Sequence, residues 1–169
     1  FLVSGMEVFM SRLQLIATCI FGLESVVSRE LKKLGYTEQT VQNGRVLFEG
    51  DELAICRSNL WLRSAERVLL KVGSFEAYSF EELFENTKKL PWPDFLPKDA
   101  EFPVEVTSIN STLFSVSDCQ AIIKKAVVEK MKQKYRIDWF EETGPRFKIE
   151  AALLKDYVTI SIDTSGVGL

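Results

Sequence analysis

Hydrophobic and polar positions alternate with a period that changes along the chain, and these changes mark the expected elements. Residues 12–18 alternate as in a half-buried strand. Residues 22–35 place Leu and Val at helical spacing and end at Gly35, a typical C-terminal cap. The Asn43-Gly44 pair then predicts a two-residue hairpin between strands at 36–42 and 45–50.

The pattern continues with a second helix and a fourth strand. Asp51 is a candidate N-cap for a helix at 51–61, and residues 66–75 are rich in Val and Leu, as strands are. The order βαββαβ predicts a ferredoxin-like module of the α+β class over residues 11–75. Such a scaffold hosts many unrelated functions, so it indicates no activity by itself.

Residues 76–165 predict a second α/β module. Ser79 and Glu82 form a capping box for a helix that ends at Pro91 and whose Phe80, Leu83 and Phe84 are expected to face inward. The remaining pattern predicts a strand at 102–109, a helix that begins with a second capping box at Ser117 and Gln120, and strands at 146–153 and 157–165.

The first residues and the hydropathy of the chain predict neither secretion nor membrane insertion. Residues 1–10 are left out of the fold prediction, because an opening Phe1 followed by Met6 and Met10 is interpreted as vector sequence or a start inside a longer chain. They lack the basic region and long apolar core of a secretory signal, and no run of about 18 apolar residues could span a membrane. A cytoplasmic protein is expected.

Residue types exclude most catalytic and metal chemistry. The chain has no histidine, which removes the commonest general base and zinc ligand. Cys19, Cys56 and Cys119 are far apart and form no C-x-x-C motif, so reduced thiols are expected and neither a disulfide nor a metal site. No pair of carboxylates is spaced for acid/base work across an active site. No catalytic residue is assigned.

Charge is unevenly distributed along this acidic chain. The net charge is −3, yet residues 108–137 contain six Lys and Arg against two acids, a balance of +4 that leaves −7 for the rest. On a helical wheel, Lys125 and Lys132 point away from the apolar residues and Lys124 lies on the flank, so the three share a solvent face. A locally basic surface can attract a polyanion even when the net charge opposes it, which makes nucleic acid the leading partner class. An ordinary solvated helix face remains the alternative.

Two further features bear on nucleic-acid binding. The stretch 107–115 offers hydroxyl donors, including Ser111 and Thr112, close to a helix N-terminus, where a phosphate could bind; an ordinary polar connection explains the stretch equally well. Large aromatic residues are usually core, so Trp61, Trp92 and Trp139 are expected inside. Phe114, in the hydroxyl-rich loop, is the exception that could stack on a base.

Four long stretches resemble a known family. CIFGLESVVSRELKKLGY, NGRVLFEGDELAICRSNLWLRSAERVLLKV, SVSDCQAIIKKAVVEKM and ETGPRFKIEAALLKDYVTISIDTSGVGL together are similar to the N-terminal half of bacterial THUMP-domain RNA methyltransferases. That group is related to the ribosomal large-subunit guanine-N2 methyltransferases and is often labelled as N6-adenine-specific DNA methylases. The resemblance covers about residues 12–169.

The resemblance implies a function that the residue pattern alone leaves open. It implies that the second module is a THUMP domain that binds structured ribosomal RNA, with Lys124 and Lys125 as first candidates for phosphate contact and Lys132, Arg146, Ser111 and Thr112 as weaker ones. It also implies a C-terminal methyltransferase domain that binds S-adenosylmethionine. The chain shows no glycine-rich cofactor turn and no Asn-Pro-Pro-aromatic motif. Residues 166–169 are therefore expected to begin the linker to that absent domain.

Two rival functions remain at this stage. A protein-interaction or scaffold module would use the lysine face to meet an acidic partner. A small-molecule regulatory domain would require an apolar pocket with a few converging polar groups.

Overall fold

The computed structural model describes residues 12–139 and 141–165, and the chain divides into two compact units between Glu66 and Arg67. The expectations for residues 1–10 and 166–169 therefore fall outside the described residues. No helix in the described residues is long and apolar enough to cross a membrane.

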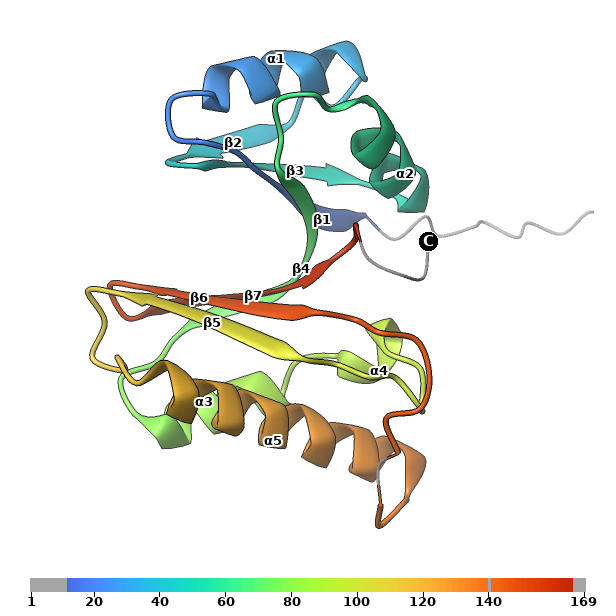
Figure 1. The fold of residues 1–169 in the computed structure, drawn as a ribbon, viewed down its shortest axis with the longest axis vertical. Helices are drawn as coiled ribbons and strands as arrows, with labels where there is room; N and C mark the ends of the chain where they lie inside the picture. Colours follow the sequence, from blue (N-terminus) through green and yellow to red (C-terminus); the bar gives the residue numbers. More distant parts are fainter. Residues whose placement is uncertain (1–11, 140, 166–169) are drawn as a thin grey trace, which may run out of the picture. The chain divides into compact units, whose positions relative to one another are not determined.

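The first unit is a small antiparallel sheet with two helices on one side (Figure 1). Its strands lie in the order β2-β3-β1, and β1 pairs with β3 along its whole length, from Leu13 opposite Gly50 to Thr18 opposite Arg45. The backbone N–H of Glu66 donates to the carbonyl of Thr18 at 2.7 Å. The elements of this unit are β1 (Leu13–Thr18), α1 (Glu24–Lys33), β2 (Gln39–Gln42), β3 (Arg45–Gly50) and α2 (Glu52–Trp61).

Local sequence signals explain the ends of these elements. The Asp51 carboxylate accepts a hydrogen bond from the Ala54 N–H at 2.9 Å, which confirms the predicted cap of α2. Gly35 follows α1 with φ +99°, a conformation that glycine adopts without steric cost. Gln42 pairs with Arg45, so the predicted two-residue hairpin is confirmed, and Gly44 supplies its positive φ of +74°.

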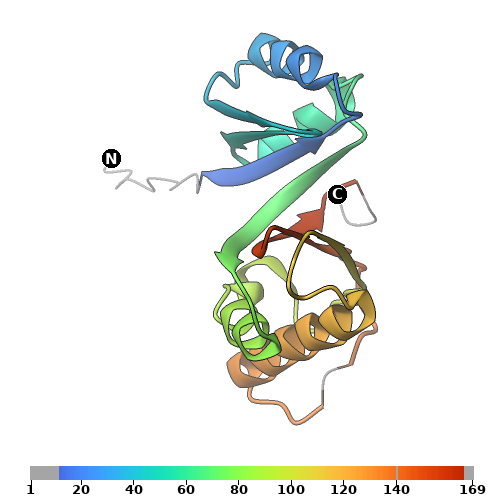
Figure 2. The ribbon, with the colours of Figure 1, turned by 90° about the vertical axis from the view of Figure 1, so that its left-hand side faces the viewer.

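The second unit has a mixed sheet in the order β4-β7-β6-β5. Strands β5 and β6 are parallel because α5 crosses between them, whereas β4, β7 and β6 pair antiparallel. Helices α3 and α5 lie side by side on one face of this sheet in both views (Figures 1 and 2). The elements are β4 (Arg67–Glu76), α3 (Phe80–Lys88), α4 (Trp92–Phe95), β5 (Val104–Ile109), α5 (Val116–Tyr135), β6 (Ile149–Leu154) and β7 (Tyr157–Asp163).

The core of the second unit lies between its sheet and its helices. Trp92 is fully buried, and its Nε1–H donates to the carbonyl of Thr87 at 2.8 Å, which satisfies the one polar atom of the ring. The predicted apolar side of α5 is confirmed, since Cys119, Ile123, Ala126, Val127 and Met131 are buried and Ile122 packs partly against the core. Burial of a large apolar side chain contributes roughly 1.5–3 kcal/mol, so this stripe fixes the rotation of α5.

Three details of the helices differ from the prediction. Helix α5 begins at Val116, with Ser115 as its N-cap, so the predicted capping box at Ser117 and Gln120 is wrong. The Ser115 hydroxyl donates to the Asp118 carboxylate at 2.6 Å, which repeats the capping spacing two residues earlier. In α3 the Ser79 cap is confirmed, but Phe80 is exposed and Phe84 half-buried, because Leu83 and Thr87 form the buried side.

The turn between β6 and β7 holds two non-glycine residues in the left-handed region, Lys155 with φ +49° and Asp156 with φ +67°. This conformation costs an L-residue roughly 1–2 kcal/mol. Four hydrogen bonds to neighbouring segments offset that cost: the N–H groups of Lys155 and Asp156 donate to the Ile109 carbonyl and the Ser111 hydroxyl, and the carbonyl and carboxylate of Asp156 accept from the N–H groups of Ala77 and Thr112. The turn therefore fastens the loop before α5.

Replacing Asp156 by Ala should lower the free energy of unfolding by about 1–3 kcal/mol, because the N–H of Thr112 loses a charged acceptor and alanine tolerates positive φ poorly. The Asp156→Asn variant is the matched control: its side-chain oxygen can still accept, and asparagine adopts this conformation more readily. Urea unfolding followed by circular dichroism would measure both. Equal losses in the two variants would contradict this account of the turn.

Candidate nucleic-acid interface

Helix α5 exposes one row of its basic residues to solvent, because its apolar side packs against the sheet. Lys125 is exposed, and its ammonium group lies 5.9 Å from the centre of the Phe84 ring of α3. On the same ring, the ammonium group of Lys88 lies at 5.8 Å. The two cations are thus within 11.7 Å of each other, the sum of the two distances. We call Phe84, Lys88 and Lys125 the lysine–phenylalanine cluster.

The cluster is an attractive place for a phosphate group. Cation–π contact within about 6 Å of a ring is worth roughly 0.5–1 kcal/mol at an exposed site, enough to bias both lysine side chains toward the Phe84 ring. No ion pair of Lys88 or Lys125 occurs within the described residues. Their charge is therefore not offset by a contacting carboxylate, and phosphates of a polyanion could approach both.

Lys88 is the residue that sequence reasoning missed. It follows Phe84 by four residues, a spacing that places the two side chains on one face of α3. That spacing is the only signal in the sequence for a contact between Lys88 and Phe84. It gives no information on Lys125, which lies on another helix. Only the packing of α3 beside α5 brings the two cations to one ring.

Lys124 is held inside the unit instead of facing a partner. Its ammonium group lies 2.7 Å from the carboxylate of Glu142, donates to the carbonyl of Phe102 at 2.9 Å and stands 4.0 Å from the centre of the Phe102 ring. The N–H of Phe102 donates to the same carboxylate at 3.3 Å. These contacts join α5 to the start of β5 and to the loop before β6. A phosphate would have to displace Glu142 to reach Lys124, which leaves Lys125 as the stronger of the two first candidates.

Ser111 and Thr112 are also used internally. The N–H of Thr112 donates to the Asp156 carboxylate at 2.6 Å, and the Ser111 hydroxyl accepts from the Asp156 N–H and donates to the carbonyl of Ile109. A carboxylate thus already occupies the position at which the predicted loop would hold a phosphate. Asp118 adds a second negative charge in the first turn of α5. The arrangement matches the alternative of an ordinary polar connection.

Lys132 and Arg146 lie elsewhere on the second unit. Lys132 is half-buried in the last turn of α5, and Arg146 is exposed beside a short bridge to Glu101. Neither makes an ion pair with another described residue. Within the described residues, no ion pair or ring contact links them to the lysine–phenylalanine cluster, so their role in binding stays a prediction.

Carboxylates dominate the opposite end of α3. Glu76, together with Asp156 and Glu82, raises the pKa of the Tyr78 hydroxyl, since a tyrosinate would be repelled by these charges. Tyr78 is exposed. This end of the unit therefore has a negative potential, which disfavours a polyanion, whereas the lysine–phenylalanine cluster favours one.

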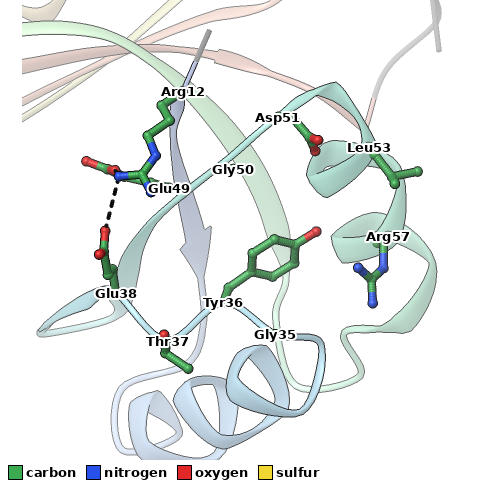
Figure 3. A pocket seen from close by; sticks show the side chains of 10 residues that line it. All are labelled: Arg12, Gly35, Tyr36, Thr37, Glu38, Glu49, Gly50, Asp51, Leu53 and Arg57. Atoms are coloured by element: carbon green, nitrogen blue, oxygen red, sulfur yellow. Dashed lines mark hydrogen bonds and ion pairs between the residues drawn. The ribbon is translucent and has the colours of Figure 1, made fainter. Parts of the chain in front are cut away.

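The first unit contains a pocket of about 450 Å³ whose lining is shown in Figure 3. Arg12 lies 3.6 Å from Glu38 and 3.4 Å from Glu49, and the Arg57 guanidinium stands 5.7 Å from the centre of the Tyr36 ring. Five of the ten lining residues are charged. A small-molecule regulatory domain would instead require a pocket with only a few converging polar groups. No group of three potential metal ligands occurs in the described residues.

Comparisons with known proteins agree with this two-unit organisation. The model of the RlmL ferredoxin-like domain matches residues 14–69, and the model of the THUMP domain matches residues 77–163, half of the chain. The chain belongs to the THUMP-domain family. Its fold class is α+β, with a ferredoxin-like domain before the THUMP domain, as the sequence predicted.

The relatives carry methyltransferase names. A Bacillus subtilis protein named "Putative RNA methyltransferase YpsC" is 53% identical over 162 residues, covering 95% of this chain and 42% of that protein. The ribosomal RNA large subunit methyltransferase K/L of Cellvibrio japonicus is 31% identical over 92% of this chain and 21% of its own length. The chain thus spans less than half of these relatives.

A solved structure gives the same result for the fold. The crystal structure of a predicted N6-adenine-specific DNA methylase from Listeria monocytogenes is 55% identical, with a TM-score of 0.88 over 91% of this chain and 40% of that one. The ferredoxin-like and THUMP domains of this chain therefore have the fold of the corresponding part of that protein.

The β5–α5 loop of the THUMP domain lacks the glycine-rich turn that would cradle a nucleotide cofactor. The one parallel strand pair of this domain in the described residues, β5 and β6, is joined through α5, as in a dinucleotide-binding unit. The loop between β5 and α5 contains no glycine, and Asp156 already uses its Thr112 N–H. This loop therefore offers no glycine-rich turn to a cofactor that carries a phosphate or a carboxylate.

The internal role of Lys124 can be measured. Replacing Lys124 by Met, which keeps most of the aliphatic stem, should lower the free energy of unfolding of the THUMP domain by about 1–2 kcal/mol through the lost contacts to Glu142 and Phe102. A double-mutant cycle with Glu142→Gln should give a coupling of about 0.5–1 kcal/mol. Lys125→Met, one residue away and exposed, is the control and should cost no more than its single cation–π contact, about 0.5 kcal/mol. Equal effects of the two Met variants would contradict the assignment.

Proposed function

We propose that this chain is the RNA-binding, substrate-positioning N-terminal part of an S-adenosylmethionine-dependent RNA methyltransferase. The names of the two relatives that match 95% and 92% of the chain support an RNA methyltransferase. The name of the Cellvibrio japonicus relative supports ribosomal RNA as the substrate class, and 23S RNA guanine-N2 as the target is our extension of it. The cofactor would bind to a C-terminal methyltransferase domain of the whole protein, which is also the expected partner of this chain.

The observation that carries the RNA contact is the lysine–phenylalanine cluster. Two cations from different helices converge on one ring, and no described carboxylate pairs with either. Ammonium groups bind phosphates as point charges and neutralise the backbone without reading the bases. Structured RNA suits this mode, because a folded RNA presents phosphates in a fixed spacing whereas its deep major groove is inaccessible to side chains.

A weak contact of this kind is sufficient for the proposed role. Binding that rests on a few phosphates has a dissociation constant of roughly 10⁻⁴–10⁻⁶ M at physiological salt. When the same chain also carries the methyltransferase domain, the bound RNA reaches that domain at an effective concentration in the millimolar range for a short linker. The THUMP domain would then raise the local concentration of substrate instead of taking part in methyl transfer.

The double variant Lys88→Ala with Lys125→Ala tests this proposal. Binding of the chain to fragments of ribosomal RNA, measured by fluorescence anisotropy over a salt series, should weaken. The slope of log K against log salt should become shallower by roughly 1.5, the value for two lost phosphate contacts.

The matched control removes two lysines from α1, with Lys32→Ala and Lys33→Ala, and changes the net charge by the same amount. It should leave the slope within about 0.5 of the wild-type value. An unchanged slope in the Lys88 and Lys125 variant would remove the proposed interface. Binding of an acidic protein but of no RNA would favour the scaffold function instead.

A further inference from the structure

Trp61, the last residue of α2, lies in solvent instead of in the core. The sequence pattern predicted that all three tryptophans are buried, yet only Trp92 is, whereas Trp61 is 64% exposed and Trp139 is 77% exposed. The prediction for Trp61 and Trp139 is therefore wrong. Phe114, the aromatic residue expected to be exposed, is 80% exposed. Trp139 lies outside any helix or strand, whereas Trp61 belongs to a helix with further exposed apolar residues.

Helix α2 has two opposite sides that carry few charges. The buried side consists of Ala54, Ile55 and Ser58. At 100° per residue the opposite side consists of four exposed residues, which we call the outer face of α2: Leu53, Cys56, Leu60 and Trp61. Leu53 is 59% exposed and Leu60 is 77% exposed. A helix that is apolar on all sides is ordinarily buried, so a partner is expected to cover the outer face.

The charge of the outer face disfavours nucleic acid as that partner. Arg57 is the one charged residue within this arc of α2, and its guanidinium stands 5.7 Å from the centre of the Tyr36 ring. Glu52 adds a carboxylate in the first turn of the helix. Binding of RNA rests on several phosphate contacts from lysine and arginine, which this face does not supply. An apolar protein surface fits its composition.

The size of the outer face distinguishes a second copy of the chain from another domain. The exposed parts of Leu53, Leu60 and Trp61 amount to roughly 300 Å² of apolar surface. A stable interface between two proteins buries about 800 Å² on each partner. An interface between two domains of one chain is smaller, about 600–1,500 Å² in total, and the connection between the domains keeps their effective concentration in the millimolar range. The outer face has the size expected for contact with a domain of the same chain.

The end of β7 lies within reach of the outer face. Thr164 follows β7, and its N–H and its hydroxyl both donate to the carbonyl of Val68, at 3.1 Å and 2.6 Å. Val68 is seven residues after Trp61, a span of at most about 25 Å between Cα atoms. This limit depends on chain length alone and holds for any arrangement of the two units. A domain that follows β7 can therefore contact α2, since a domain of about 200 residues has a radius of gyration of roughly 16 Å.

We propose that the outer face of α2 is the docking site of the C-terminal methyltransferase domain of the whole protein, an inference that rests on the proposed function for the presence of that domain. Leu53, Leu60 and Trp61 stand at positions i, i+7 and i+8 of one helix, the spacing of apolar anchors that enter a groove. This contact gives the ferredoxin-like domain a role in holding the methyltransferase domain, separate from the RNA contact of the THUMP domain.

Cys56 reports on this contact because it is exposed on the outer face, whereas Cys19 and Cys119 are buried. Burial raises the pKa of both buried thiols and so lowers the fraction of reactive thiolate. The readout is the rate at which a maleimide modifies Cys56 in the absence of RNA, followed on its peptide by mass spectrometry. This rate should be at least about tenfold lower in the whole protein than in the 169-residue chain.

The variant Leu60→Lys tests the face itself. In the whole protein it should raise the Cys56 modification rate by about fivefold or more, because an ammonium group enters an apolar groove only by losing its hydration. In the 169-residue chain the same variant should leave the rate within about twofold, since Leu60 is 77% exposed and lysine is a good helix former. The matched control Leu154→Lys adds the same charge at an exposed leucine of the THUMP domain and should leave the rate in the whole protein unchanged.

Equal rates in the whole protein and the 169-residue chain would overturn the docking site, as would protection that Leu60→Lys leaves intact. Protection in the chain alone that grows with its concentration would assign the face to a second copy and overturn the proposal as well. The Lys88 and Lys125 variant separates this inference from the RNA contact, because it should weaken RNA binding and leave the Cys56 rate unchanged. Protection of Cys56 in a whole protein that transfers no methyl group to RNA would contradict the proposed function and support the docking site.

Discussion

The packing of one apolar stripe of α5 on its sheet decides which charges the THUMP domain presents. Cys119, Ile123, Ala126, Val127 and Met131 are all buried. A single large side chain among them stabilises the domain by roughly 1.5–3 kcal/mol, whereas an exposed ion pair contributes at most about 1 kcal/mol. The stripe therefore sets the rotation of the helix, and the lysines take whatever positions remain. Exposure of Lys125 and the inward turn of Lys124, which is its neighbour, both follow from this one constraint.

Internal carboxylates compete with any phosphate for the donors of this domain. Glu142 holds Lys124, and Asp156 holds the N–H of Thr112. Each carboxylate is positioned by contacts that also join separate segments of the chain, so a phosphate that displaced it would have to offset the loss of those contacts. The lysine–phenylalanine cluster is different, because an aromatic ring orients its cations without neutralising them. A cation–π contact leaves the charge available to a ligand, and a salt bridge does not.

The ends of the second unit differ in electrostatic character. Glu76, Glu82 and Asp156 surround Tyr78 at one end, strongly enough to raise the pKa of its hydroxyl. The basic residues lie along α5 and at the end of α3. The opposite signs of the two ends orient a charged ligand before contact. This effect acts over about one Debye length, roughly 8 Å at physiological salt. Orientation of a nonspecifically bound RNA needs no base-specific contact.

The sequence alone determined the order of elements apart from the short helix α4, the hairpin at Gly44, the caps at Asp51 and Ser79 and the apolar side of α5, because each depends on residues within about one or two turns of chain. The whole-chain resemblance also gave the THUMP domain. Only the tertiary structure decided which basic residues are available. Lys88 and Lys125 are 37 positions apart and meet at Phe84, while Lys124 finds Glu142 across a loop. Helical periodicity can say that a lysine leaves the core, but the side chain it then meets depends on how distant segments pack, which no local pattern encodes.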